Sequence, residues 1–162
     1  MKLKINPIQV LIDNNIDFCI IGGYCRYLLG IEKDFKDIDI VTNTDIDLFK
    51  LFPYATKNIY GGVMIKDPDF DIWDIKNNII PSKTFDELYD NYFISYDAIM
   101  YNPRTNKWWL HNFDSRVIRI NEKVIYKQVH KFNIEKMLKL FKRKGILLSE
   151  KAIEYIENFK GD

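Results

Sequence analysis

A glycine pair followed at short range by two aspartates one residue apart constrains this chain more than any other feature. Gly22 and Gly23 follow an apolar run at residues 18–21, which is typical of a buried strand that enters a turn and then opens a helix. Glycine lets the main chain approach a ligand closely, and the N-terminus of a helix is electropositive. The pattern therefore predicts a phosphate cradle, although a plain strand-to-helix turn has the same signature.

The two aspartates, Asp37 and Asp39, lie in an alternating apolar and acidic segment at residues 37–41. Successive side chains of a strand point to opposite faces, so we expect both carboxylates on one face. Aspartate is a poor strand former, and neighbouring carboxylates that repel each other attract a divalent cation. An exposed strand face is the alternative, which the apolar neighbours disfavour. A phosphate cradle beside a metal-binding pair indicates nucleotide chemistry.

Length and composition predict a soluble globular protein. The 162 residues, 47% hydrophobic and 29% charged, suffice for one domain with a core and a small helical appendage. No apolar run approaches the roughly 18 residues of a membrane helix, and the first residues lack a signal-peptide core. We therefore expect a cytoplasmic protein. Cys19 and Cys25 are interpreted as reduced, buried thiols, and His111 and His130 fit no metal-binding spacing.

Charge is distributed unevenly along the chain, although the net charge is only +1. Between positions 123 and 144 there are eight lysines and arginines and one glutamate, whereas acids are frequent between positions 34 and 74. A basic helix beside an acidic pocket suits a nucleic-acid-binding catalyst. An ordinary solvated helix face has the same composition, so both interpretations stay open.

Periodicity and turn residues predict an α/β head over residues 1–119 and a small all-helical neck over residues 120–162. Helices are expected over residues 6–14, 24–29 and 84–89, with another that begins at Thr44. Strands are expected over residues 18–21 and 37–41, with hairpins that pair 63–66 with 70–75 and 98–101 with 107–110. The first hairpin would turn at residues 67–69. Helical spacing resumes at Asn133, with a stop at Gly145 and a cap at Ser149.

Residues 22–26 (Gly-Gly-Tyr-Cys-Arg) and 36–42 (Lys-Asp-Ile-Asp-Ile-Val-Thr) resemble the start of the head domain of class II CCA-adding enzymes and bacterial poly(A) polymerases. These enzymes belong to the polymerase-β-like nucleotidyltransferase superfamily. Residues 70–76 and 95–101 resemble later family segments in the same order, and the basic stretch 136–145 is similar in kind to the family's neck helix. The resemblance implies an α/β (α+β) head with a mixed antiparallel sheet and flanking helices, followed by a small helical neck.

Several positions depart from the family pattern. Tyr27 stands where the family has aspartate, and Tyr92 and Phe93 stand where it has the Arg-Asp pair that contacts ribose. Asp97 stands at the family's asparagine, where capping the loop before the strand is an equal interpretation. The neck lacks the Glu-Asp-x-x-Arg element that selects the base. We therefore expect a reduced or divergent relative, without assuming CCA addition.

The resemblance implies a Mg²⁺-dependent transfer of a nucleotide from a nucleoside triphosphate. Asp37, Asp39 and Asp71 would bind the metal and act as the catalytic residues. Asp71 and Asp74 are three apart and face opposite sides of one strand, so only one of them joins the metal face. The resemblance favours Asp71.

The triphosphate would be bound by Gly22, Gly23 and Arg26, with Lys76 facing it as well, and Lys36 is a lesser candidate. An RNA 3′ end, reached through the basic C-terminal helices, is the first acceptor to consider. A protein or small-molecule acceptor is a second hypothesis. The third is a non-catalytic nucleotide- or RNA-binding module on the same fold. The base transferred and the oligomeric state are left open.

Overall fold

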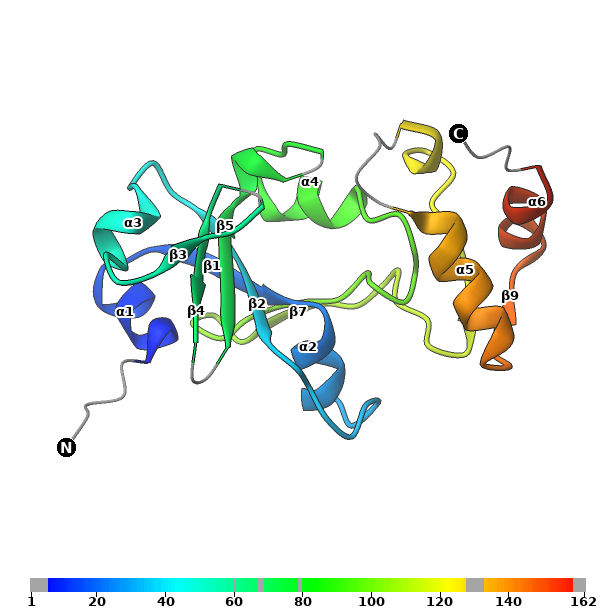
Figure 1. Ribbon diagram of the computed structural model, residues 1–162, viewed down its shortest axis with the longest axis horizontal. Helices are drawn as coiled ribbons and strands as arrows, with labels where there is room; N and C mark the ends of the chain where they lie inside the picture. Colours follow the sequence, from blue (N-terminus) through cyan, green and yellow to red (C-terminus); the bar gives the residue numbers. More distant parts are fainter. Residues whose placement is uncertain (1–5, 60, 67–68, 79, 128–132, 159–162) are drawn as a thin grey trace.

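The computed structural model describes residues 6–59, 61–66, 69–78, 80–127 and 133–158. A seven-stranded sheet with the order β3-β4-β5-β2-β1-β6-β7 forms the body of the molecule (Figure 1). Its strands are β1 (Asp17–Ile21), β2 (Ile38–Asn43), β3 (Thr56–Lys57), β4 (Val63–Ile65), β5 (Phe70–Asp74), β6 (Met100–Asn102) and β7 (Lys107–Trp109). Neighbouring strands run antiparallel except β2 and β5, which are parallel. The predicted mixed sheet is thus confirmed.

Helices cover both faces of this sheet. They are α1 (Pro7–Asp13), α2 (Gly23–Leu28), α3 (Leu48–Leu51) and α4 (Phe85–Asp90). The first three pack on one face through Leu11, Cys25 and Leu48, and α4 packs on the other through Leu88 and Tyr89. The central strand β1 is apolar along most of its length because it is covered on both sides, which is why its sequence is a continuous apolar run.

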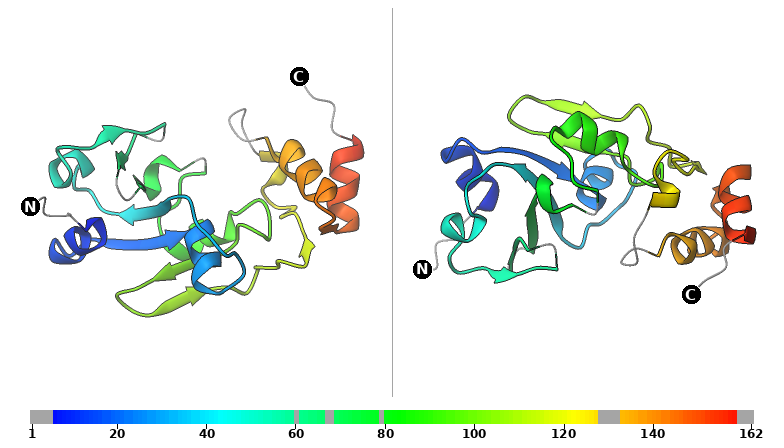
Figure 2. Two further views of the ribbon diagram at one scale, coloured as in Figure 1. Left: turned by 60° about the horizontal axis from the view of Figure 1, so that its bottom comes forward. Right: turned by 90° about the horizontal axis from the view of Figure 1, so that it is seen from above.

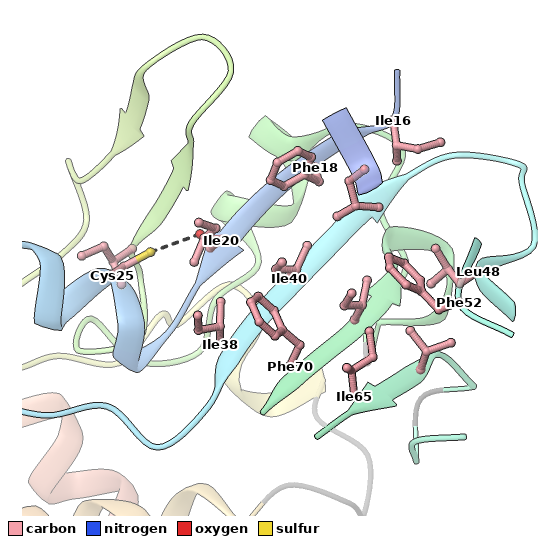
Figure 3. Packing of buried hydrophobic residues seen from close by; sticks show 14 residues of the cluster. Ile16, Phe18, Ile20, Cys25, Ile38, Ile40, Leu48, Phe52, Ile65 and Phe70 are labelled. Carbon is pink, nitrogen blue, oxygen red and sulfur yellow. Dashed lines mark hydrogen bonds between the residues drawn. The ribbon is translucent and has the colours of Figure 1, made fainter. Parts of the chain in front are cut away.

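The larger core lies between the sheet and α1, α2 and α3 (Figure 3). Ile38 and Ile40 of β2 and Phe70 of β5 point into it. The Cys25 thiol donates a hydrogen bond to the carbonyl oxygen of Ile20 at 3.2 Å, which fixes the start of α2 against β1. Cys19 and Cys25 are both free and buried, as predicted.

The C-terminal part lies beyond one end of the sheet (Figures 1 and 2). It contains the 3₁₀ turn η2 (Ile125–Lys127), α5 (Ile134–Arg143), β9 (Leu147–Leu148) and α6 (Glu150–Asn158). The all-helical prediction was wrong in one respect, because β9 pairs in parallel with β8 (Val117–Ile118). Two-residue strands are too short to carry a periodic signal. The core of this part also includes Phe93, Ile94 and Ile118, so packing crosses position 119, and the boundary there stays a prediction.

Most helix starts and stops agree with the sequence. Thr84 caps α4, Ser149 accepts a hydrogen bond from the backbone N–H of Ala152, and Gly145 adopts a positive φ after α5. The predicted start at Thr44 was wrong, because Asp47 caps the four-residue helix α3. Both predicted hairpins form. Residues 67–68, in the predicted turn of the first hairpin, lie outside the described residues. No helix in the described ranges has the length and apolarity to cross a membrane.

Candidate active site

The parallel pairing of β2 and β5 places two of the predicted carboxylates side by side. Asp39 is directly opposite Asp71 in the register of the two strands. Their neighbours Ile40 and Ile72 are buried on the α1–α3 side, so both carboxylates belong to the other face. Asp37 comes immediately before β2. Asp39 and Asp71 thus share one face of the sheet, while the expectation that Asp37 shares the face of Asp39 stays a prediction, because Asp37 lies outside β2.

Electrostatics make this pair unusual. Burial, followed by the charges of Asp37 and Asp71, raises the pKa of Asp39 to about 7. Burial also raises the pKa of Asp71, with Asp37 adding to it, while the side chain of Asn58 opposes the shift by donating a hydrogen bond to Asp71 at 2.5 Å. Carboxylates that are kept from water and repel one another gain most from a nearby cation.

The donor set fits magnesium better than a metal that needs a complete protein cage. Within the ranges that the structure describes, no three or more His, Cys, Asp and Glu side chains are grouped closely enough to hold a metal ion alone. Magnesium prefers oxygen ligands and is usually bound by one or two carboxylates together with substrate phosphates and water. Asp39 and Asp71, with Asp37 nearby, provide such a partial set of oxygen ligands.

The predicted glycine turn lies next to these carboxylates. Gly22 caps α2 with φ 73° and ψ −143°, a conformation that side-chain-bearing residues rarely adopt. A Cβ atom at Gly22 would lie 3.4 Å from Oδ2 of Asp39. At Gly23 it would lie 3.5 Å from Nη2 of Arg26 and 3.7 Å from Oε2 of Glu32. The glycines therefore keep free a space between the acidic pair and the Arg26 guanidinium group.

Arg26 is held beside this space by a network that sequence reasoning missed. Its Nε donates to Oε1 of Glu32 at 2.7 Å, and its Nη1 donates to the carbonyl oxygen of Tyr96 at 3.2 Å. The guanidinium also lies over the Tyr96 ring, 4.4 Å from its centroid, and 3.5 Å from a carboxylate oxygen of Asp97. No sequence signal links Arg26 with Tyr96, because 70 residues separate them.

A hollow of about 500 Å³ brings one predicted glycine, the arginine and two of the predicted acids into one place, whereas Gly22 and Asp71 are not among its lining residues. It is lined by Gly23, Arg26, Glu32, Asp34, Phe35, Lys36, Asp37 and Asp39. Its volume lies within the range of small-molecule sites. A larger hollow of about 700 Å³, lined in part by Tyr92, His111 and Asn121, contains none of the predicted site residues. The smaller hollow is therefore the candidate nucleotide pocket.

Asp74 and Lys76 are not among the residues that line the candidate nucleotide pocket. Asp74 accepts hydrogen bonds from the Thr42 hydroxyl and the Thr44 backbone N–H, both at 2.9 Å. The Lys76 ammonium group lies 2.8 Å from Asp74 and donates to the Thr44 carbonyl oxygen at 2.5 Å. Asp74 thus fastens the chain that leaves β2, while the register assigns Asp71 to the position beside Asp39. The structure does not bring Lys76 to the candidate pocket.

The basic segment forms an exposed face on α5. Lys136, Lys139, Lys142 and Arg143 line a shallow groove of about 290 Å³, and Lys139 is paired with Glu135. Residues 128–132, which include His130 and Lys131, lie outside the described residues. His111 lies against the ring of Tyr89, with 4.8 Å between the ring centroids.

No protein-family model and no curated protein matches the chain. Solved structures do match it. A tRNA-processing enzyme with CTP superposes with a TM-score of 0.68 at 15% identity over 94% of this chain and 45% of its own. A tRNA nucleotidyltransferase complexed with a primer tRNA and an incoming ATP analog gives 0.68 at 16% identity, over 94% of this chain and 49% of its own. The Thermotoga maritima CCA-adding enzyme complexed with tRNA gives 0.61 at 19% identity, over 94% and 42%.

These matches establish the fold. The chain has the architecture of a nucleotidyltransferase head with a following helical segment, in agreement with the fold that the sequence resemblance implied. It spans less than half the length of each of these three structures.

Proposed function

We propose that this chain is a nucleotidyltransferase that moves a nucleoside monophosphate from a nucleoside triphosphate to a hydroxyl group, with an RNA 3′ end as the acceptor. The observation that carries the proposal is the in-register pair of Asp39 and Asp71 beside the glycine turn at Gly22. A nucleotide-binding module without catalysis has no need for two partly buried, mutually repelling carboxylates beside a phosphate pocket.

The triphosphate would lie in the hollow next to the glycine turn. Gly22 and Gly23 let its oxygens approach the main chain, and Arg26 supplies charge-assisted hydrogen bonds to the same oxygens. Glycine at both positions keeps the space that a Cβ would narrow. The reacting α-phosphate would then face Asp39 and Asp71. Holding the phosphate in line with the attacking hydroxyl is the largest task of such a site.

Asp37, Asp39 and Asp71 would hold Mg²⁺ together with phosphate oxygens of the substrate and water, because in the described residues these carboxylates do not form a complete metal site by themselves. When bound, the metal would stabilise the charge that develops on the entering and leaving oxygens. Asn58 orients the Asp71 carboxylate through its 2.5 Å hydrogen bond. The pKa of Asp39 is raised to about 7, and a bound cation would favour its ionised form at neutral pH.

RNA is favoured as the acceptor by the exposed basic groove of α5. Its four cations, Lys136, Lys139, Lys142 and Arg143, lie together on one side of the helix. Phosphate contacts of this kind provide sequence-independent affinity for nucleic acid that falls steeply with salt. The named solved structures that contain tRNA concern other proteins of the same fold. For this chain, tRNA is one RNA acceptor among those to test.

The test is transfer of label from each of the four α-³²P nucleoside triphosphates with Mg²⁺. Total tRNA, a generic RNA and the protein itself serve as acceptors. Two variants, Asp39→Asn and Asp71→Asn, should lose at least about 100-fold in rate, because charge stabilisation in such sites has that magnitude. The exposed acid Asp13 of α1 provides the matched control Asp13→Asn, which should keep full activity.

Each labelling result supports one of the hypotheses about the acceptor. Label on RNA in the wild type and in Asp13→Asn, but not in the two site variants, supports RNA nucleotidyl transfer and identifies the base. Label on the protein moves the assignment to protein nucleotidylation. Nucleotide binding without transfer to any acceptor contradicts the RNA proposal and favours the non-catalytic module.

A further inference from the structure

We propose that Glu32 and Tyr96 are positioning residues that aim the Arg26 guanidinium at the phosphate cradle, and that Tyr96 links this aim to helix α5 of the C-terminal part. The inference rests on the proposed function, because it concerns a triphosphate bound in the same pocket. Glu32 lies outside the segments that resemble the family, and Tyr96 lies within one of them, residues 95–101, but neither was a predicted site residue.

Three contacts hold the guanidinium in one orientation. Glu32 accepts from Nε of Arg26 at 2.7 Å, and the same carboxylate oxygen accepts from the Tyr96 hydroxyl at 2.6 Å. The Tyr96 carbonyl oxygen accepts from Nη1 at 3.2 Å, and its ring lies under the group. A guanidinium is planar and rigid, so fixing Nε and Nη1 also fixes Nη2.

The remaining nitrogen points to the glycine turn. A Cβ atom at Gly23 would lie 3.5 Å from Nη2 of Arg26, which places Nη2 at the edge of the space left by the glycines. The side chain of Arg26 is only 12% exposed. A largely buried guanidinium group whose Nη2 faces the glycine turn can give directional, charge-assisted hydrogen bonds to phosphate oxygens. An arginine without these partners would be free to turn away.

Glu32, rather than the residue that follows the arginine, provides the carboxylate that pairs with Arg26. The residue after the arginine is aromatic here, and its ring packs with Tyr24 and Phe35 at centroid distances of 5.9 and 4.9 Å. The carboxylate that pairs with Arg26 therefore comes from the segment after α2. Burial alone would raise the pKa of Glu32, but the hydrogen bonds from Tyr96 and Arg26 lower it, so the pair is ionised at neutral pH. Asp97 adds a second, longer contact at 3.5 Å.

Tyr96 also belongs to the packing of the C-terminal part. Its ring meets Phe141 of α5 at 5.2 Å between centroids and 63° between planes, and it packs against the cluster that contains Leu138 and Phe141. A shift of α5 would therefore move the ring that supports Arg26. This predicts that the packing of α5 influences triphosphate affinity although α5 does not line the pocket.

The experiment compares binding of nucleoside triphosphate and monophosphate by calorimetry with Mg²⁺ present. Glu32→Gln and Tyr96→Phe should each weaken triphosphate binding about 10-fold, equivalent to about 1.4 kcal/mol, and change monophosphate binding less than about twofold. In an Arg26→Met background the same substitutions should cause no further loss of triphosphate affinity. The effects of residues that act through one group are not additive. Matched controls are Glu157→Gln and Tyr126→Phe, at an exposed glutamate and an exposed tyrosine.

A second readout needs no nucleotide. In NMR spectra of the ligand-free protein, the Nε–H signal of Arg26 should exchange slowly with water, and Glu32→Gln should accelerate that exchange. Phe141→Leu should broaden the same signal and weaken triphosphate binding two- to fivefold, on the order of 0.4–1 kcal/mol.

The outcomes separate this inference from the proposed function. If Glu32→Gln and Tyr96→Phe bind triphosphate as tightly as the wild type does, the inference is overturned and the proposed function still stands. Equal losses for monophosphate and triphosphate indicate a general structural role and also overturn it. A wild type that binds no triphosphate contradicts the proposed function, and the positioning role is refuted with it. Fast exchange of the Arg26 signal in the wild type refutes the positioning role alone.

Discussion

Gly22 and Asp39 lie in contact across the strand-to-helix turn, so that a Cβ atom at residue 22 would be 3.4 Å from the carboxylate oxygen Oδ2 of Asp39. Gly22 has φ 73°. The backbone conformation therefore favours glycine here, and a side chain at this position would lie against the Asp39 carboxylate. The turn and the carboxylate pair form one structural unit, although 17 residues separate Gly22 from Asp39 in the sequence.

Gly22→Ala should destabilise the protein by about 1–3 kcal/mol, because the backbone would be held in a conformation that L-residues rarely adopt. It should also abolish triphosphate binding, because the new methyl group narrows the space beside Asp39. Gly30→Ala is the control, since Gly30 has φ 75° but no atom near its Cβ position. The control should lose stability and keep binding, as measured by urea unfolding and calorimetry. Equal binding by both variants would contradict this account.

Asp39→Asn should stabilise the metal-free protein at alkaline pH. The folded-state pKa of Asp39 is about 7, against an ordinary value of 3.8, so folding favours the protonated form. The stability contributed by this group is fully present below about pH 4 and is lost as the pH rises through 7. At pH 8 in EDTA the variant should be more stable than the wild type by up to about 4 kcal/mol, the equivalent of the full shift.

The difference should disappear near pH 4, and Mg²⁺ should stabilise the wild type at pH 8 without stabilising the variant. Urea unfolding at both pH values measures this. Parallel pH profiles for the two proteins would show that Asp39 does not carry the raised pKa.

Gly62→Ala should disrupt the sheet at the start of β4, where the chain meets β5. A Cβ atom there would lie 2.0 Å from the carbonyl oxygen of Ile72 and 2.8 Å from the Cα of Trp73, and backbone atoms in a sheet cannot move aside cheaply. The cost should reach about 3 kcal/mol, the upper end for overpacking. Gly145→Ala, with no atom within 4 Å of its Cβ position, should cost about 1 kcal/mol through its positive φ alone. Thermal unfolding distinguishes the two, and equal melting temperatures would refute the close contact.

Lys76→Met tests whether Lys76 takes part in triphosphate binding. Its ammonium group is engaged by Asp74 and by the Thr44 carbonyl oxygen, on the chain that leaves β2. Because these contacts hold the ammonium group outside the lining of the candidate pocket, the substitution should change triphosphate affinity by less than about twofold, that is by less than about 0.4 kcal/mol. Arg26→Met, measured in the same way, should weaken affinity far more. A loss for Lys76→Met as large as that for Arg26→Met would show that the lysine swings to the phosphates.

The secondary structure around the site was predictable because each element carries its own local signal. The run that became β1 is apolar because both faces are covered, and the alternation around Asp39 reflects one buried face and one face that is only partly buried at Asp39. Caps such as Thr84 and Ser149 are local as well. By contrast, β8 and β9 contain two residues each, and no period can be detected in so short a strand.

Contacts between distant segments were beyond the reach of the sequence. The choice of Asp71 over Asp74 needed the register of β5 against β2, which depends on tertiary pairing. Asn58 contacts Asp71 and Tyr96 contacts Arg26 only through the fold, and the family resemblance of residues 95–101 gives no sign that Tyr96 would hold Arg26. Asp47 rather than Thr44 caps α3 because both residues offer suitable side chains three positions apart, and tertiary packing decides between them.

The most direct test of the central claim compares ATP labelled on the α-phosphate with ATP labelled on the γ-phosphate, each incubated with the protein, Mg²⁺ and an RNA that has a free 3′ hydroxyl. The same test is made with any other triphosphate that proves to be the substrate. Nucleotidyl transfer through Asp39 and Asp71 predicts that the α label enters the RNA while the γ label leaves as pyrophosphate in equal amount. An RNA with a blocked 3′ end should receive neither. Entry of the γ label into the RNA, or no transfer of the α label from any nucleoside triphosphate, would contradict the account.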